Sequence, residues 1–171
     1  MVLLSGLFGA AIGAFLTLWF NLWKVNRDER NARCDELCAA IRDVGAMASE
    51  YWSKQFDKPA EQEIAEAKLY AAQILLEGLS ADFTPYLSMD SQEQIDSLLS
   101  DYVDLLTGGK FSEFGREVDL IRLARAPQRA SMFIVTLRRL YRASLPLHST
   151  IQAFHANKRR VLDMPLGWSD K

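Results

Sequence analysis

The chain has 171 residues, of which 49% are hydrophobic and 25% are charged, and its formal net charge is −2. With only nine glycines and five prolines, it has neither the composition of a disordered chain nor that of a fibrous protein. Apart from an apolar start, about 145 residues remain, an ordinary size for one domain with a single core.

The first element is an uncharged stretch from Val2 to Trp23, VLLSGLFGAAIGAFLTLWFNLW. As a helix it would be about 33 Å long, enough for the hydrocarbon core of a bilayer. Aromatic residues end it and basic residues follow at once: Lys24, Arg27, Arg30 and Arg33. These features predict a transmembrane helix over residues 2–23 in the cell inner membrane, with the N-terminus outside and the C-terminal domain in the cytoplasm. A cleaved signal peptide is the alternative, but the stretch lacks a basic start and a small-residue cleavage site.

Small or weakly polar residues recur at every fourth position of this stretch, on one side of the predicted helix: Ser5, Gly9, Gly13, Thr17 and Asn21. Gly9 and Gly13 form a GxxxG pair, which lets helices approach closely in lipid. The stripe predicts a homo-oligomer that associates within the membrane. The alternative is that these glycines have no such role, because glycine is common in membrane helices.

Charge is unevenly distributed along the chain. The net charge is +2 over residues 1–34, −11 over residues 35–109 and +7 over residues 110–171. Such asymmetry favours either an anionic partner for the basic part or packing of the acidic and basic parts against each other, within one subunit or between neighbours. We favour the packing interpretation slightly.

Hydrophobic periodicity predicts two long helices after the apolar stretch, over residues 26–54 and from Pro59 to Leu79. The first would bury one stripe of residues: Cys34, Leu37, Ile41, Val44, Ala48 and Tyr51. The second would bury Ile64, Ala67, Ala71, Leu75 and Gly78. Cys34 and Cys38, four residues apart, are expected to be small buried residues of the first helix.

A third helix is predicted from Asp90, which would cap it in a box with Glu93, to Gly108-Gly109. Its predicted buried stripe is Ile95, Leu98, Leu99, Tyr102 and Leu106. A fourth helix is predicted to start near Ser112 and to bury Phe114, Val118 and Ile121.

Ala126-Pro127 is predicted to begin one more helix, which Pro146 interrupts or kinks before it resumes to about Arg160. Its predicted buried residues are Ala130, Phe133, Ile134, Leu137, Leu140 and Tyr141. No segment has the pattern of a strand. The sequence therefore predicts an all-α protein with a transmembrane helix (2–23), a cytosolic helical bundle (24–162) and a C-terminal tail (163–171).

Few residues of this chain suit catalysis or metal binding. Cys34, Cys38, His148 and His155 are its only cysteines and histidines, and their spacing does not fit the usual zinc patterns. We expect no metal and no cofactor. Arg138, Arg139 and Arg142 line one side of a predicted helix and form a candidate patch for an anionic partner.

Arg142 and His148, in the run RASLPLH, resemble the Arg-x(4–6)-His motif of HEPN domains, which are helical bundles that occur as ribonucleases and RNA-binding modules. The resemblance implies that Arg142 would hold a phosphate and His148 would be the acid–base group. Pro146 within the motif and Ala143 after the arginine depart from the family pattern.

An apolar span followed by a HEPN-like helical domain is similar to the small membrane accessory proteins of type VI CRISPR systems and to single-span effectors of phage defence. That likeness implies a pore-forming or membrane-perturbing oligomer, with the lipid bilayer and an RNA or RNA-guided effector complex as partners. A membrane-tethered scaffold that binds a cytosolic protein is the first alternative, and a membrane-bound HEPN-type ribonuclease is the second. We expect a protein that is not an enzyme.

Overall fold

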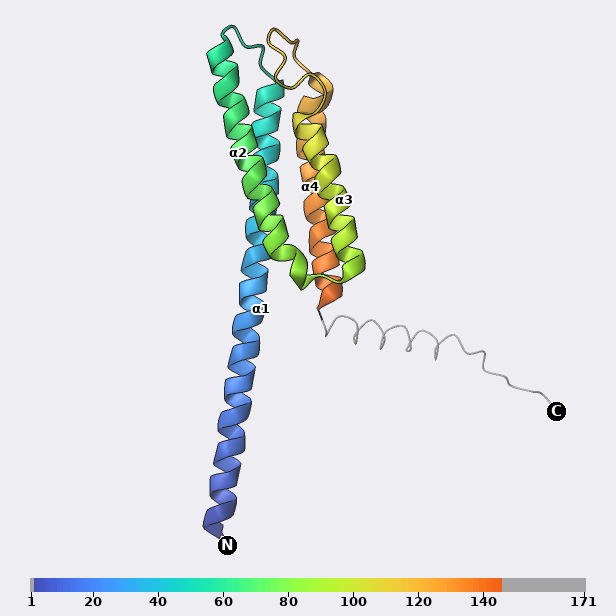
Figure 1. Cartoon of the computed structure of the whole chain (residues 1–171). Helices are drawn as coiled ribbons and strands as arrows, with labels where there is room; N and C mark the ends of the chain where they lie inside the picture. The colour runs from blue at the N-terminus through green and yellow to red at the C-terminus, as the bar shows by residue number, and fades with distance from the viewer. Residues whose placement is uncertain (1, 146–171) are drawn as a thin grey trace, which may run out of the picture.

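The computed structural model of the chain describes residues 2–145, and it describes side chains from residue 12 onward. These residues form four α-helices and a short 3-10 helix: α1 (Val2–Trp52), α2 (Pro59–Phe83), η1 (Thr84–Tyr86), α3 (Met89–Thr107) and α4 (Leu120–Ser144). Successive helices run in alternating directions, and α1 extends far beyond the other three (Figure 1). No strand occurs within residues 2–145, so the prediction of an all-α fold is confirmed for this part of the chain.

The prediction of a transmembrane helix over residues 2–23 is wrong. Among the described residues, no helix has the combination of length and apolar character that crossing a membrane requires. The uncharged stretch is not a separate element, because α1 continues without a break from Trp23 into the charged residues that follow. The same finding overturns the predicted location in the inner membrane.

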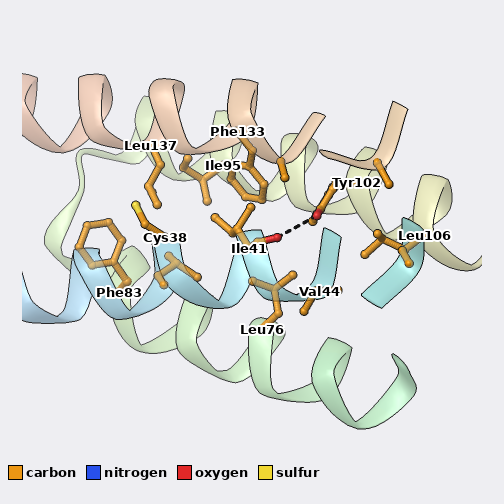
Figure 2. Packing of buried hydrophobic residues seen from close by; sticks show 14 of the residues in the cluster. Cys38, Ile41, Val44, Leu76, Phe83, Ile95, Tyr102, Leu106, Phe133 and Leu137 are labelled. Atoms are coloured by element: carbon orange, nitrogen blue, oxygen red, sulfur yellow. Dashed lines mark hydrogen bonds between the residues drawn. The ribbon is translucent and has the colours of Figure 1, made fainter. Parts of the chain in front are cut away.

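The C-terminal half of α1 is the central helix of the bundle, with α2 and α4 on either side of it (Figures 1 and 2). All six residues predicted to be buried on this helix are buried. The core around them contains Leu76 and Phe83 from α2, Ile95, Tyr102 and Leu106 from α3, and Phe133 and Leu137 from α4 (Figure 2). Burial of each such side chain stabilises the fold by about 1.5–3 kcal/mol. The buried stripe of α1 packs in one core with residues of the other three helices.

The face that α2 buries differs from the prediction. Gln62, Leu69, Leu76, Ser80 and Phe83 are buried against the bundle. Ile64 and Leu75, predicted to be inside, are 57% and 59% exposed. The helix carries apolar residues on two sides, and the side with the larger residues Leu69, Leu76 and Phe83 is the one that packs on α1.

No helix begins near Ser112. Residues 108–119 form a connection in which Gly109, Ser112 and Gly115 have positive φ angles, a backbone conformation that ends a helix. Phe114 and Val118, predicted to be buried, are 53% and 39% exposed. The prediction failed because the apolar residues of this segment recur at helical spacing, whereas contacts with Tyr51, far away in the chain, hold its backbone in a non-helical conformation.

Pro127 does not start a helix but lies inside α4, which begins at Leu120. A proline cannot donate an amide hydrogen bond to the carbonyl four residues before it, here that of Leu123. The hydroxyl of Ser49, on α1, donates to this Leu123 oxygen at 3.1 Å. The bundle therefore supplies the donor that the proline lacks, and the helix continues through it.

Asp119 caps α4, and its replacement with alanine is expected to lower the free energy of unfolding by about 1 kcal/mol. Its carboxylate accepts hydrogen bonds from the amides of Ile121 and Arg122 at 3.0 and 2.9 Å. Asp90, predicted to cap α3, is instead a first-turn residue behind the N-cap Ser88. Asp90→Ala is the matched control and should cost no more than about 0.5 kcal/mol, from the helix dipole alone. Urea denaturation of both variants measures the difference, and equal losses would contradict this assignment.

Candidate functional site

A segment of α1 outside the bundle exposes apolar side chains on every side. All residues from 12 to 29 are exposed. Between residues 12 and 25, nine large hydrophobic residues are 39–70% exposed: Ile12, Phe15, Leu16, Leu18, Trp19, Phe20, Leu22, Trp23 and Val25. We call Ile12–Val25 the projecting segment. At 3.6 residues per turn these nine positions surround the helix axis, and a helix that is apolar all round is normally buried.

Part of the small-residue stripe lies on the projecting segment. Gly13, Thr17 and Asn21 are exposed and follow one another at every fourth position. The hydroxyl of Thr17 donates to the carbonyl of Gly13 at 2.8 Å, so its polarity is satisfied within the helix. A Cβ built at Gly13 would have no neighbour within 4 Å. Ser5 and Gly9 fall within α1 but outside the residues whose side chains are described.

The base of the projecting segment is basic, and its arginines pack on aromatic rings. The Arg27 guanidinium lies 5.2 Å from the centre of the Trp23 ring. Arg30 and Arg33 lie 5.1 and 5.8 Å from the ring of Tyr86, which follows α2. These residues were interpreted as the flanking charges of a membrane span. In the structure, two of them fasten η1 to α1.

The candidate arginine patch for an anionic partner, on α4, is partly occupied by a contact within the chain. Arg138 donates to the Asp35 carboxylate at 3.0 Å and so joins α4 to α1. Arg139 and Arg142 are exposed. His148 lies outside the described residues, as does His155, so the pairing of Arg142 with His148 stays a prediction.

The two cysteines lie next to each other in the interface between α1 and α4. Both are free thiols and both are buried, as predicted. The pKa of Cys38 is lowered to about 7, first because of its hydrogen bond with the Cys34 thiol and second because Arg138 lies beside it. The pKa of Cys34 is raised, by the same hydrogen bond and by burial. The pair therefore holds one thiolate more readily than two.

This thiol pair is expected to make stability depend on pH. Between about pH 7 and 8.5, Cys38 has lost its proton in the folded chain but keeps it in the unfolded chain. The unfolded state then binds more protons, so the free energy of unfolding should rise with pH by about 1 kcal/mol across this interval. Above pH 9 the raised pKa of Cys34 reverses the sign. Urea titrations from pH 6 to 10 should show this maximum, and Cys38→Ala should remove the rise. A rise that persists in this variant would contradict the assignment.

At the other end of the bundle, Arg116 is buried in a cluster of aromatic rings. Its guanidinium lies 4.3 Å from the Tyr51 ring centre and 4.5 Å from that of Trp52, and its Nη2 donates to the Tyr51 carbonyl at 2.6 Å. Glu66 accepts hydrogen bonds from the hydroxyls of Tyr51 and Ser112, both at 3.0 Å. These contacts fasten residues 108–119 to α1 and α2. The burial of Arg116 was not predicted, because nothing in the sequence around it indicates a buried arginine.

A hollow of about 420 Å³ lies beside this cluster, between the end of α1 and the start of α2. Charged side chains of both signs line it, and Lys54 and Glu50 among them pair at 2.6 Å.

Within the described part of the chain, no group of three or more His, Cys, Asp or Glu residues is placed to hold a metal ion. The projecting segment exposes a large apolar surface in the described part of the chain, and this surface suits contact with other helices. Comparison with protein-family models, with curated proteins and with solved structures finds no match for this chain.

Proposed function

We propose that this protein is a self-assembling scaffold, in which copies of the chain associate through the projecting segment and hold their helical bundles together. The observation that supports the proposal is the ring of nine exposed apolar side chains around one free stretch of helix. Their exposed surface is roughly 1,200 Å² per copy, judged from typical side-chain areas. A standard protein interface buries about 800 Å² on each partner, so this surface is large enough for a stable complex.

Other copies of the chain fit this surface better than a single groove on a different protein. A groove covers one side of a helix and would leave the remaining apolar residues exposed. Helices of several copies can surround one another, and every copy then contributes the same surface. Gly13 and Thr17 allow close approach on one side, while Phe15, Trp19 and Leu22 provide large side chains on the other sides.

The proposal keeps the self-association and the scaffold role of the sequence-based hypotheses. The hypothesis of a membrane-perturbing effector required a helix that crosses the bilayer, and it is therefore not part of the proposal. The resemblance to HEPN domains and to accessory proteins of RNA-guided defence stays a prediction, as does ribonuclease activity.

The mass of the full chain in solution tests the proposal. Light scattering after size-exclusion chromatography should give a multiple of the 19.4 kDa chain mass. Phe15→Glu combined with Trp19→Glu should reduce it to a single chain, because two charges would be buried without partners, while the circular dichroism of the bundle stays unchanged. Met89→Glu is the control, because Met89 is 79% exposed but lies at the start of α3. A wild-type mass of one chain at tens of micromolar protein would overturn the proposal.

A further inference from the structure

The side of α2 that faces away from α1 carries an apolar stripe. Ile64, Ile74 and Leu75 are 57%, 69% and 59% exposed. Ala67, Ala71 and Gly78 lie between them at the alternating three- and four-residue spacing of a helix-packing seam. A Cβ at Gly78 would have no neighbour within 4 Å. We call this stripe the α2 outer face.

The side of α4 that faces away from the core carries three exposed apolar residues among polar and basic ones. Ile121, Met132 and Val135 are 63%, 54% and 68% exposed. Exposed arginines, Arg125 and Arg139 among them, lie along the same side of the helix. We call this stripe the α4 outer face. It offers large side chains where the α2 outer face offers several small ones.

The two helices have opposite charges. Helix α2 contains five acidic residues and one lysine, a net charge of −4. Helix α4 contains six arginines and no acidic residue, a net charge of +6. Arg122 and Arg138 are paired with Asp119 and Asp35. Among the described residues no ion pair is formed by the others along the two faces: Glu63, Glu77, Arg125, Arg129, Arg139 and Arg142.

We propose that the α2 outer face of one copy docks on the α4 outer face of a second copy, with contacts between the apolar side chains of the two stripes and with Glu–Arg pairs between the two helices. Because α1 lies between α2 and α4, the two faces point away from each other (Figures 1 and 2). One copy therefore cannot satisfy both of its own faces. The contact is head-to-tail, and its repetition builds a ring or an open chain of bundles.

Charge excludes the symmetric alternatives. Pairing of two α2 outer faces would set glutamates against glutamates, and pairing of two α4 outer faces would set arginines against arginines, each at a cost of several kcal/mol. A single-stranded nucleic acid is the other candidate for an arginine-rich surface. Such surfaces stack bases on aromatic rings, whereas the exposed apolar residues of the α4 outer face are aliphatic or methionine.

This inference rests on the proposed function, because three or four apolar side chains on each face bind weakly until the projecting segments have brought the copies together. Cysteine cross-linking of the full chain tests it. Two variants, Ile74→Cys and Val135→Cys, are oxidised separately and as a mixture. Their native Cys34 and Cys38 are buried, and the wild-type chain measures any background from them. Ser97→Cys, exposed on α3, replaces either variant as the control.

The mixture of Ile74→Cys and Val135→Cys should form at least about tenfold more cross-linked dimer than either variant alone, because two α2 outer faces or two α4 outer faces repel each other. It should exceed mixtures of either variant with Ser97→Cys by the same factor. A chain with both substitutions should form a ladder of larger products. Equal cross-linking of Ile74→Cys alone would show a symmetric contact and overturn the inference. The inference would also be overturned if the mixture gave no cross-link and the chain bound RNA through the α4 outer face. In that case Arg139→Glu combined with Arg142→Glu would weaken RNA binding tenfold or more.

Mass and cross-linking separate the two proposals. An oligomeric mass without the Ile74–Val135 cross-link overturns the docking inference and leaves the proposed function standing. Cross-linking of a chain whose mass is 19.4 kDa in dilute solution overturns the proposed function and supports the docking contact.

Discussion

Replacing Trp52 with alanine is expected to lower the free energy of unfolding by about 3–5 kcal/mol, a large part of the roughly 5–15 kcal/mol that is usual for a single domain. Trp52 is 1% exposed and ends α1 at the point where the other three helices are joined. Its indole Nε1 donates to the Leu106 carbonyl at the end of α3, at 2.9 Å. Its own carbonyl accepts from the Asp119 amide, at 3.2 Å, just before α4. The side chain thus connects α1 to α3, and the backbone connects α1 to α4.

Two further variants divide this loss into its causes. Trp52→Phe keeps an aromatic ring but leaves the buried Leu106 carbonyl without its donor, which should cost about 1–3 kcal/mol. Met89→Ala is the control, because Met89 is 79% exposed at the start of α3, away from the projecting segment and from both outer faces, and its replacement should leave the unfolding of the bundle unchanged. Urea denaturation at one protein concentration measures all three. If Trp52→Ala unfolds at the same urea concentration as the wild-type chain, Trp52 does not stabilise the bundle by connecting α1 to α3 and α4.

Helical periodicity identified the core of α1, α3 and α4 because each of these helices has one dominant apolar side toward the bundle. Leu37, Ile41 and Val44 on α1 and Phe133 and Leu137 on α4 are all buried, as predicted. For such helices the pattern contains enough information, since only one face can be removed from water.

Periodicity could not choose between the two apolar sides of α2. Ile64 and Leu75 repeat at helical spacing as well as Leu69 and Leu76 do, and only the neighbouring helix decides which side is buried. The prediction of a helix that starts near Ser112 failed for a different reason. Ser112 adopts φ = 66° and its amide donates to the Tyr51 hydroxyl, and Arg116 inserts between the rings of Tyr51 and Trp52 on α1. No local pattern in the sequence records these contacts between distant parts of the chain.

The candidate site, too, was predictable from the sequence only in part. The uncharged stretch was recognisable from composition, and its exposed part is the surface on which the proposed function rests. That the predicted helix over residues 26–54 could be continuous with this stretch was also foreseeable, and the two form the single helix α1. The two outer faces were beyond prediction, because the residues of the α2 outer face were assigned to the core. Only the uneven charge of the chain pointed to them.

Gly45→Ala is expected to lower the free energy of unfolding by about 2–3 kcal/mol, although alanine favours a helix over glycine by about 1 kcal/mol. A Cβ at Gly45 would lie 2.6 Å from the Tyr102 hydroxyl oxygen and 3.1 Å from the Cβ of Ala130. The hydroxyl cannot move away freely, because it donates to the Ile41 carbonyl at 2.9 Å inside the core. The absence of a side chain at Gly45 therefore lets Tyr102 of α3 and Ala130 of α4 lie close to α1.

Removal of the obstructing atom should restore much of this loss. Tyr102→Phe alone should cost about 1 kcal/mol for the lost hydrogen bond, and the double variant with Gly45→Ala should be more stable than the sum of the two losses by about 1 kcal/mol or more. Gly78→Ala is the matched control. An alanine there meets no neighbour within 4 Å and should stabilise α2 by about 0.5–1 kcal/mol. Urea denaturation of the four variants completes the cycle. If the two single variants lose free energy of unfolding additively, the Tyr102 hydroxyl is not the group that excludes an alanine at position 45. The contact with Ala130 of α4 would then account for the cost.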